Sequence, residues 1–152
     1  MMKPAKPATV AAITDLILGV FRLNGALLQS GDTLVAGLGL TSARWQVLGA
    51  IDAAPVALPI AHIARNMGLS RQAVQRLANE MAKDGLVSFA ANPHHARAQL
   101  VRMTSKGKAA FDAAMKLQRS WATELARGLS PAAISNAARL LDQVLNRLEN
   151  AN

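Results

Sequence analysis

The hydrophobic positions of the chain follow a helical period over most of its length. Between residues 9 and 29, apolar side chains recur every three to four positions, which predicts a long first helix. The glycines that follow, together with Asp32, indicate a break after that helix. The apolar positions are Ile13, Leu16, Ile17, Val20, Phe21, Leu23, Leu27 and Leu28.

Three shorter helices are expected next. Thr41 or Ser42 can cap the first of them, which runs to the proline of the segment IDAAP. Pro59 fits the first turn of the second helix, PIAHIARNM, and Gly68 stops that helix. Ser70 is then placed as the N-cap of the third helix.

After the third short helix, the hydrophobic positions no longer follow the helical period and instead recur at every second residue. Val87 and Phe89 alternate with polar or small neighbours, Asn92 and Pro93 mark a turn, and the segment QLVRM alternates back. This pattern predicts a β-hairpin.

Two long helices complete the chain. Thr104 caps the first of them and Gly128 ends it, whereas Ser130 and Pro131 begin the second. The last helix carries an apolar stripe that must be covered by the other long helices or by a second copy of the chain. The stripe consists of Ile134, Ala137, Ala138, Leu141, Val144, Leu145 and Leu148.

The third short helix has two faces of different chemistry. Its apolar stripe contains Ala73, Val74, Leu77 and Met81, and its polar stripe contains Gln72, Gln75, Arg76 and Asn79 with Arg71 beside it. A solvated face more commonly mixes Glu with Lys, whereas Arg and Gln side chains make bidentate hydrogen bonds to guanine and adenine edges. The pattern therefore favours a helix that reads DNA over an ordinary wet surface.

Composition and charge support a helical, polyanion-binding protein. The 152 residues are 51% hydrophobic but only 3% aromatic, which is typical of a helix-rich globular chain. Cysteine is absent, so disulfides, zinc–thiolate sites and thiol redox sensing are excluded. The net charge is +8, and residues 61–110 alone hold eight basic and two acidic side chains. Such a local excess is the pattern expected of a polyanion partner.

Several other classes of protein are disfavoured. Asp15 interrupts the apolar run at the N-terminus, so we expect no cleaved signal. No stretch approaches the length of uninterrupted apolar residues that a membrane span requires, and the absence of cysteine is compatible with the cytoplasmic location that we expect. The chain has no G-x-S-x-G elbow, Walker loop or H-E-x-x-H motif, so we expect no enzyme and no cofactor. His94 and His95 have only His62 as a further histidine and lack the ligand count of a closed zinc site, so no metal is expected.

The order of these parts resembles the MarR family of transcriptional regulators. The segments LTSARWQVLGAI, IAHIARNMGLSRQAVQRLANEMAKDGLV and NPHHARAQLVRMTSKG carry the resemblance, which covers about residues 10–150 and is most specific over residues 40–107. It implies a mostly α fold with a small β-hairpin wing, in one domain over residues 1–152. A winged helix-turn-helix lobe (about 40–108) would lie between dimerisation helices (about 9–38 and 109–150).

The resemblance also implies the function. We expect a homodimer that binds double-stranded DNA at a pseudo-palindrome, with half-sites about one helical turn apart. A repressor is the expected role, and an activator is the alternative. Nine residues are expected to contact DNA: Arg65, Ser70, Arg71, Gln72, Gln75, Arg76, His94, His95 and Arg97. Four of them, on the recognition helix, would read bases or adjacent phosphates, and Arg65 and Ser70 would anchor the backbone.

The wing departs from the family's pattern, which reads Asp-x-x-Asp-Arg-Arg. Here Asn92, His95, Ala96 and Arg97 stand at the corresponding positions, so the acidic partners of the arginine are missing. Arg97 is expected to enter the minor groove, and the two histidines are expected to be polar wing residues that contact phosphate.

The resemblance further implies a small-molecule effector, often an aromatic acid or drug. Phe21, Trp45 and Phe111 are the rings expected to line its cavity, although each also fits a core position. The alternative function is a winged-helix module that binds proteins and does not read DNA sequence.

Overall fold

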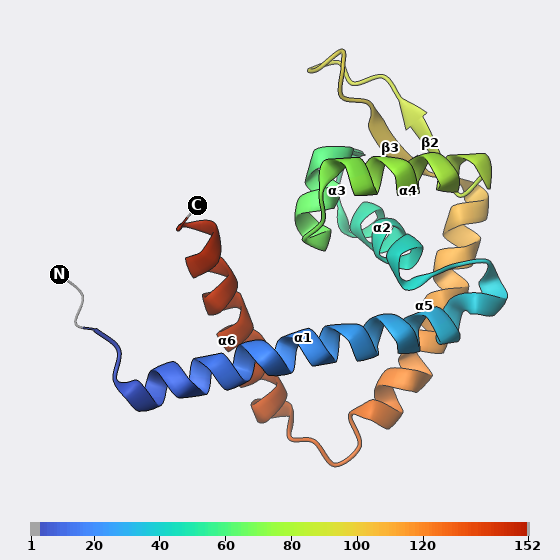
Figure 1. Ribbon diagram of the computed structural model, residues 1–152. Helices are drawn as coiled ribbons and strands as arrows, with labels where there is room; N and C mark the ends of the chain where they lie inside the picture. Colours follow the sequence, from blue (N-terminus) through green and yellow to red (C-terminus); the bar gives the residue numbers. More distant parts are fainter. Residues whose placement is uncertain (1–3, 152) are drawn as a thin grey trace. The chain divides into compact units, whose positions relative to one another are not determined.

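A computed structural model describes residues 4–151, and most of them are helical (Figure 1). The contacts divide the chain into two compact units, residues up to 117 and residues from 118 onward. The elements in chain order are α1 (Pro7–Val35), the 3₁₀ helix η1 (Ala36–Leu38), α2 (Ser42–Ala53), β1 (Leu58–Pro59), α3 (Ile60–Met67), α4 (Arg71–Lys83), β2 (Val87–Ala90), β3 (Leu100–Met103), α5 (Ser105–Leu125) and α6 (Pro131–Glu149).

The predicted hairpin is the larger part of a three-stranded antiparallel sheet in the order β1-β3-β2. Val87 of β2 pairs with Met103 of β3, and Leu58 of β1 pairs with Val101 of β3. β1 was not predicted, because a strand of two residues is too short to show an alternating pattern. Its pairing ties the start of α3 to the base of the hairpin.

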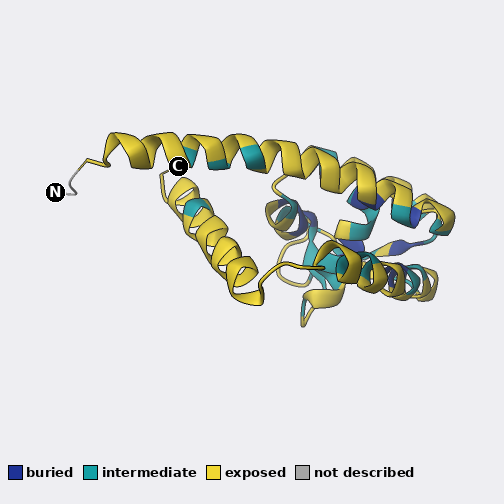
Figure 2. Ribbon diagram, turned by 90° about the horizontal axis from the view of Figure 1, so that it is seen from below, coloured by how far each residue is buried: buried dark blue, intermediate teal, exposed yellow. Residues whose placement is uncertain are grey.

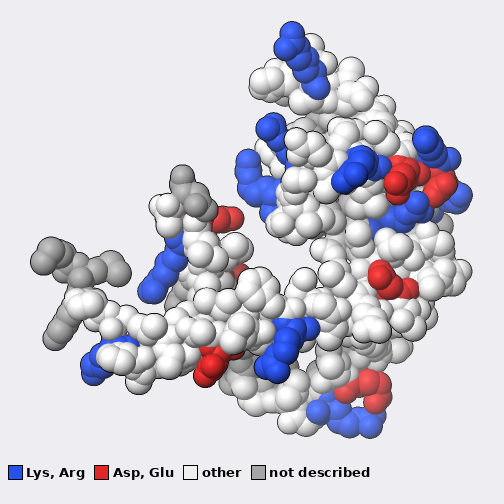
Figure 3. Space-filling model, viewed as in Figure 1, with Lys and Arg blue, Asp and Glu red and all other residues white. Residues whose placement is uncertain are grey.

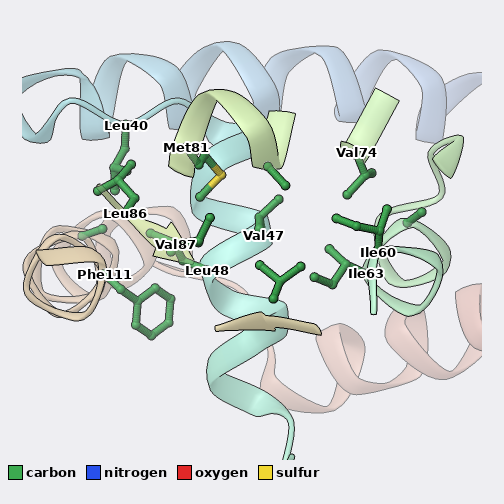
Figure 4. Packing of buried hydrophobic residues seen from close by; sticks show 14 of the residues in the cluster. Leu40, Val47, Leu48, Ile60, Ile63, Val74, Met81, Leu86, Val87 and Phe111 are labelled. Atoms are coloured by element: carbon green, nitrogen blue, oxygen red, sulfur yellow. The ribbon is translucent and has the colours of Figure 1, made fainter. Parts of the chain in front are cut away.

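A hydrophobic core joins α2, α3 and α4 to this sheet and to the first half of α5 (Figure 4). Val74 and Met81 of the predicted apolar stripe on α4 are fully buried, and Ala73 and Leu77 are partly buried. α4 therefore keeps its opposite face free. The buried cluster consists of Val35, Leu40, Val47, Leu48, Ile60, Ile63, Ala64, Val74, Ala78, Met81, Leu86, Val87, Val101, Phe111 and Ala114.

The predicted helix starts are confirmed by their hydrogen bonds. The side-chain oxygens of Thr41, Ser70 and Ser130 each accept a bond from the backbone N–H three residues later. Gly68 ends α3 in the left-handed conformation, with φ of 65°. Pro59 differs by one position from the prediction, because it is the extended N-cap of α3 and pairs with β3.

The expected break after the first helix is wrong, since α1 continues through Gly31 and Asp32 to Val35. Gly31 is buried where a side chain would collide with the hydroxyl of Ser42. Asp32 Oδ1 accepts a 2.6 Å hydrogen bond from the Ser42 N–H, and the Ser42 hydroxyl donates a 2.7 Å bond to the carbonyl of Leu28. These residues dock α1 against the start of α2 instead of breaking the helix.

Although charged residues interrupt its apolar run, one helix of the described residues is long and apolar enough, by length and composition only, to cross a membrane. The segment Pro7–Leu38 is long enough, with a mean hydropathy of 1.5 over 18 residues, because Asp15 and Arg22 are the only charged residues between positions 7 and 31. Its large apolar side chains are mostly exposed (Figure 2), and Phe21 is 70% exposed. A surface of this kind marks a contact with another apolar partner.

Candidate nucleic-acid interface

The exposed face of α4 presents the polar side chains that the sequence singled out. Arg71, Gln72, Gln75 and Arg76 are all exposed, and they lie opposite the stripe that α4 buries. The amide nitrogen of Gln75 donates a 2.9 Å hydrogen bond to Asn79 Oδ1, one turn along the helix. This bond holds the Gln75 side chain along the helix and leaves its carbonyl oxygen free for an external donor.

A groove of about 590 Å³ lies between α4, the start of α3 and the end of the loop that leads into β3. It brings three arginines of the predicted site together, Arg71 and Arg76 from α4 and Arg97 from the loop. The sequence-based prediction missed Gln99, because a single glutamine before a strand gives no signal of its own. The lining residues are Pro59, Ile60, Ala61, Arg71, Gln72, Gln75, Arg76, Arg97, Ala98 and Gln99.

The loop between β2 and β3 projects away from α4 as a wing (Figure 1). Asn92 shapes its turn: Oδ1 accepts a 3.0 Å bond from the N–H of His94, and its carbonyl accepts one of 3.3 Å from the N–H of His95. An asparagine thus supplies the acceptor that an aspartate would supply at this position, without its charge. Both histidines are exposed.

The arginines of this surface have no acidic partners. Over residues 4–151, ion pairs join Arg44 to Asp84, Lys108 to Asp52 and Asp112, and Arg127 to Glu124; none involves the arginines of the groove or Arg65. The hydrogen bond to Asp112 raises the pKa of Lys108, and its charge is shared with two carboxylates. Figure 3 shows Lys and Arg side chains over the wing and around α4. Positive charge without an acidic partner among the described residues is therefore present on α3, α4 and the wing, where it can attract a polyanion.

Two of the predicted backbone-anchoring residues lie beside the groove rather than in it. Arg65 is exposed on the last turn of α3, and Ser70 is exposed at the start of α4. The Ser70 oxygen accepts a 3.1 Å bond from the N–H of Ala73, so its own hydrogen remains available to a phosphate oxygen.

The three rings predicted to line an effector cavity have different surroundings. Phe111 is 7% exposed within the core, and Trp45 packs against the same core, whereas Phe21 is outside the cluster. Trp45 and Phe111 are thus accounted for by core packing, and Phe21 is not. No group of three or more His, Asp or Glu residues that could hold a metal is present in the described part of the chain.

Comparison with known proteins identifies relatives of this fold and sequence. Residues 38–98 match the model of the MarR family, a segment that includes α2, α3, α4 and most of the wing. An uncharacterised protein of Mycobacterium tuberculosis is 35% identical over 122 residues, which cover 80% of this chain and 84% of that protein. The transcriptional activatory protein BadR of Rhodopseudomonas palustris is 30% identical over 106 residues, which cover 68% of this chain and 61% of BadR.

A solved structure also superposes on most of the chain. The M. tuberculosis transcriptional regulator MosR, crystallised in complex with DNA, matches with a TM-score of 0.71 and 25% identity. The match covers 86% of this chain and 96% of MosR.

Proposed function

The chain belongs to the MarR family of DNA-binding transcriptional regulators, and from this premise we propose that it is a homodimeric repressor of a pseudo-palindromic operator. The family consists of regulators rather than enzymes, in agreement with the absence of catalytic motifs in the sequence. The observation that carries the proposal is the exposed row of Arg71, Gln72, Gln75 and Arg76, which lies next to the wing and has no acidic partner within residues 4–151.

In this proposal α4 enters the major groove and the wing enters the adjacent minor groove. Gln75 and Arg76, near the middle of the exposed face, would read base edges, since their side chains suit adenine and guanine. Arg65 and Ser70, at the junction of α3 and α4, would hold phosphates and fix the register of the helix. His94 and His95 would contact phosphate from the wing, and Arg97 would lie in the minor groove.

Repression is proposed because it requires only that the bound dimer occludes the operator, whereas activation also needs a contact with the polymerase. BadR is named as an activator, so a reporter gene behind the operator is the direct test of direction. Expression that rises when the protein is removed supports repression, and expression that falls contradicts it.

An aromatic effector is proposed to bind near Trp45 and Phe111, where α2 meets α5. Phe111 of α5 comes within 3.7 Å of the position that a side chain on Gly49 of α2 would occupy, so these helices are in close contact. A ligand releases DNA only if it binds the free conformation better than the bound one. A panel of aromatic acids should therefore include one that weakens operator binding and raises the Tm of the free protein; if none does either, DNA binding is constitutive.

The test of DNA recognition is the double variant Arg71→Ala, Arg76→Ala, titrated on operator DNA over a range of salt concentrations. We expect it to lose about 2 to 6 kcal/mol of binding free energy, or at least a factor of about thirty in affinity. The control is the double variant Arg22→Ala, Arg119→Ala, which removes the same charge from exposed positions outside the groove. Wild-type affinity in the Arg71, Arg76 variant would exclude this interface.

A further inference from the structure

The recognition helix is joined to the wing by a turn of only three residues, Asp84, Gly85 and Leu86. Gly85 adopts a φ of 76°, in the left-handed region that favours glycine. Since α4 ends immediately before this turn and β2 begins immediately after it, any movement of the turn changes the position of α4 relative to the wing.

The first contact on the turn comes from α2. Arg44 Nη1 lies 2.7 Å from Asp84 Oδ2, and the same nitrogen is 3.4 Å from the carbonyl oxygen of Gly39. The Arg44 side chain is only 17% exposed, so the surrounding protein constrains its direction.

Two residues at the start of α5, Thr104 and Lys106, supply the other contacts. Lys106 Nζ donates a 2.6 Å hydrogen bond to the carbonyl of Asp84, and the Thr104 hydroxyl donates a 2.6 Å bond to the carbonyl of Gly85. The backbone N–H of Thr104 bonds the carbonyl of Leu86 at 3.1 Å. Three consecutive carbonyls of the turn are thus held by one short segment of the chain.

The two charged contacts, of Arg44 and Lys106 with Asp84, contribute little to stability, whereas the Thr104 bonds are partly buried. Lys106 is exposed and the Asp84 side chain is 53% exposed, so water screens both interactions. Asp84 is moreover one of two acidic residues among positions 61–110, and its charge opposes the approach of DNA. Base recognition, in contrast, needs the reading side chains held within about 0.5 Å of their working positions. The charged contacts are therefore better suited to positioning α4 than to stabilising the fold.

We propose that Arg44, Thr104 and Lys106 form a turn clamp on Asp84, Gly85 and Leu86, and that this clamp fixes α4 relative to the wing for sequence-specific DNA binding. The clamp residues act through α4 and do not contact DNA. The inference rests on the proposed function, because only a protein that reads DNA sequence requires this alignment.

The first test is Asp84→Asn, for which charge alone predicts an unchanged ratio of operator affinity to random-DNA affinity and the clamp predicts a lower one. Loss of a negative charge near the DNA should tighten binding to every sequence. If the clamp operates, the ratio of operator affinity to random-DNA affinity falls about five- to tenfold, because Arg44 loses its ionised partner. The matched control is Glu80→Gln on the same helix, which removes an exposed carboxylate that forms no ion pair among the described residues. Its ratio should stay at the wild-type value.

The second test separates positioning from a phosphate contact by Lys106. Lys106→Met should lower the specificity ratio about five- to tenfold while the slope of log affinity against log salt stays unchanged, because no counterion-releasing contact is lost. Lys83→Met, which removes the same charge one residue before the turn, should leave the ratio unchanged. Lys106→Arg keeps a cationic donor and should restore most of the specificity.

The outcomes distinguish the clamp from simpler roles. A Lys106→Met salt slope that falls by about one unit means a phosphate contact and overturns the inference. A Tm that falls in Asp84→Asn and Lys106→Met while their specificity ratios remain wild type means a purely structural role and also overturns it. If the wild-type protein shows no preference for any DNA sequence, the proposed function fails and the inference fails with it. If the wild-type protein is specific and the clamp variants keep its specificity ratio, only the clamp is overturned.

Discussion

Gln75 illustrates how single residues prepare α4 for recognition. One of its amide hydrogens is already donated to Asn79, so the side chain loses less freedom when it meets a base. Gln75→Ala should cost about 1 to 3 kcal/mol on the operator and relax the preference at one base position. Asn79→Ala should weaken the same preference to a smaller extent, because Gln75 then has to be ordered on binding. Affinities for operators mutated one base at a time measure both effects, and a loss that is uniform over all sequences would contradict base contact.

Gly107 shows a steric constraint at the residue scale, because the backbone leaves no room for a side chain at this position. A side chain at this position would collide with the carbonyl of Leu86, which is backbone and cannot move aside cheaply. We expect Gly107→Ala to lower the free energy of unfolding by about 3 kcal/mol. Gly37→Ala, where no atom lies within 4 Å, should change it by less than about 0.5 kcal/mol. Urea unfolding of the two variants makes the comparison, and equal values would mean that the approach to Leu86 carries no strain.

At the scale of elements, the wing retains its turn without the acidic residues that normally accompany it. Asn92 supplies the acceptors for His94 and His95, and Arg97 lines the groove without an ion pair in the described structure. Since a narrow A·T-rich minor groove concentrates negative potential, Arg97→Ala should weaken binding about tenfold when the operator has A·T-rich flanks. With G·C-rich flanks the loss should be much smaller. Equal losses on the two operators would show that Arg97 does not sense the minor groove.

The elements also show what the sequence can and cannot predict. Helix starts at Thr41, Ser70 and Ser130 were predictable, because a capping oxygen acts on N–H groups only three residues away. The exposed polar face of α4 was predictable for a similar reason, since the residues on one helix face follow from the helical period. β1, the continuation of α1 through Gly31, and the contacts on the turn after α4 were not, because each depends on residues distant in the sequence that only the fold brings together.

At the scale of the whole molecule, α1 and α6 each carry apolar side chains that their own compact unit does not bury. In α6, Leu140, Leu141 and Leu145 are each at least 41% exposed, and α1 is similar. We expect a dimer by analytical ultracentrifugation, and a shift to monomer with Leu145→Glu, because the introduced charge would be buried in the interface. Gln143→Glu, on the opposite side of α6, is the control and should leave the dimer intact. Wild-type protein that sediments as a monomer would contradict this account.

One measurement tests both dimerisation and base recognition: the selection of binding sites from a random duplex library at two salt concentrations. The account predicts an inverted repeat with half-sites about one helical turn apart, and affinity that falls steeply as salt increases. Enrichment of that motif would establish a dimeric reader and supply the operator for every other test. Weak binding without a motif, or binding that hardly changes with salt, would contradict the account and favour a winged-helix protein-interaction module.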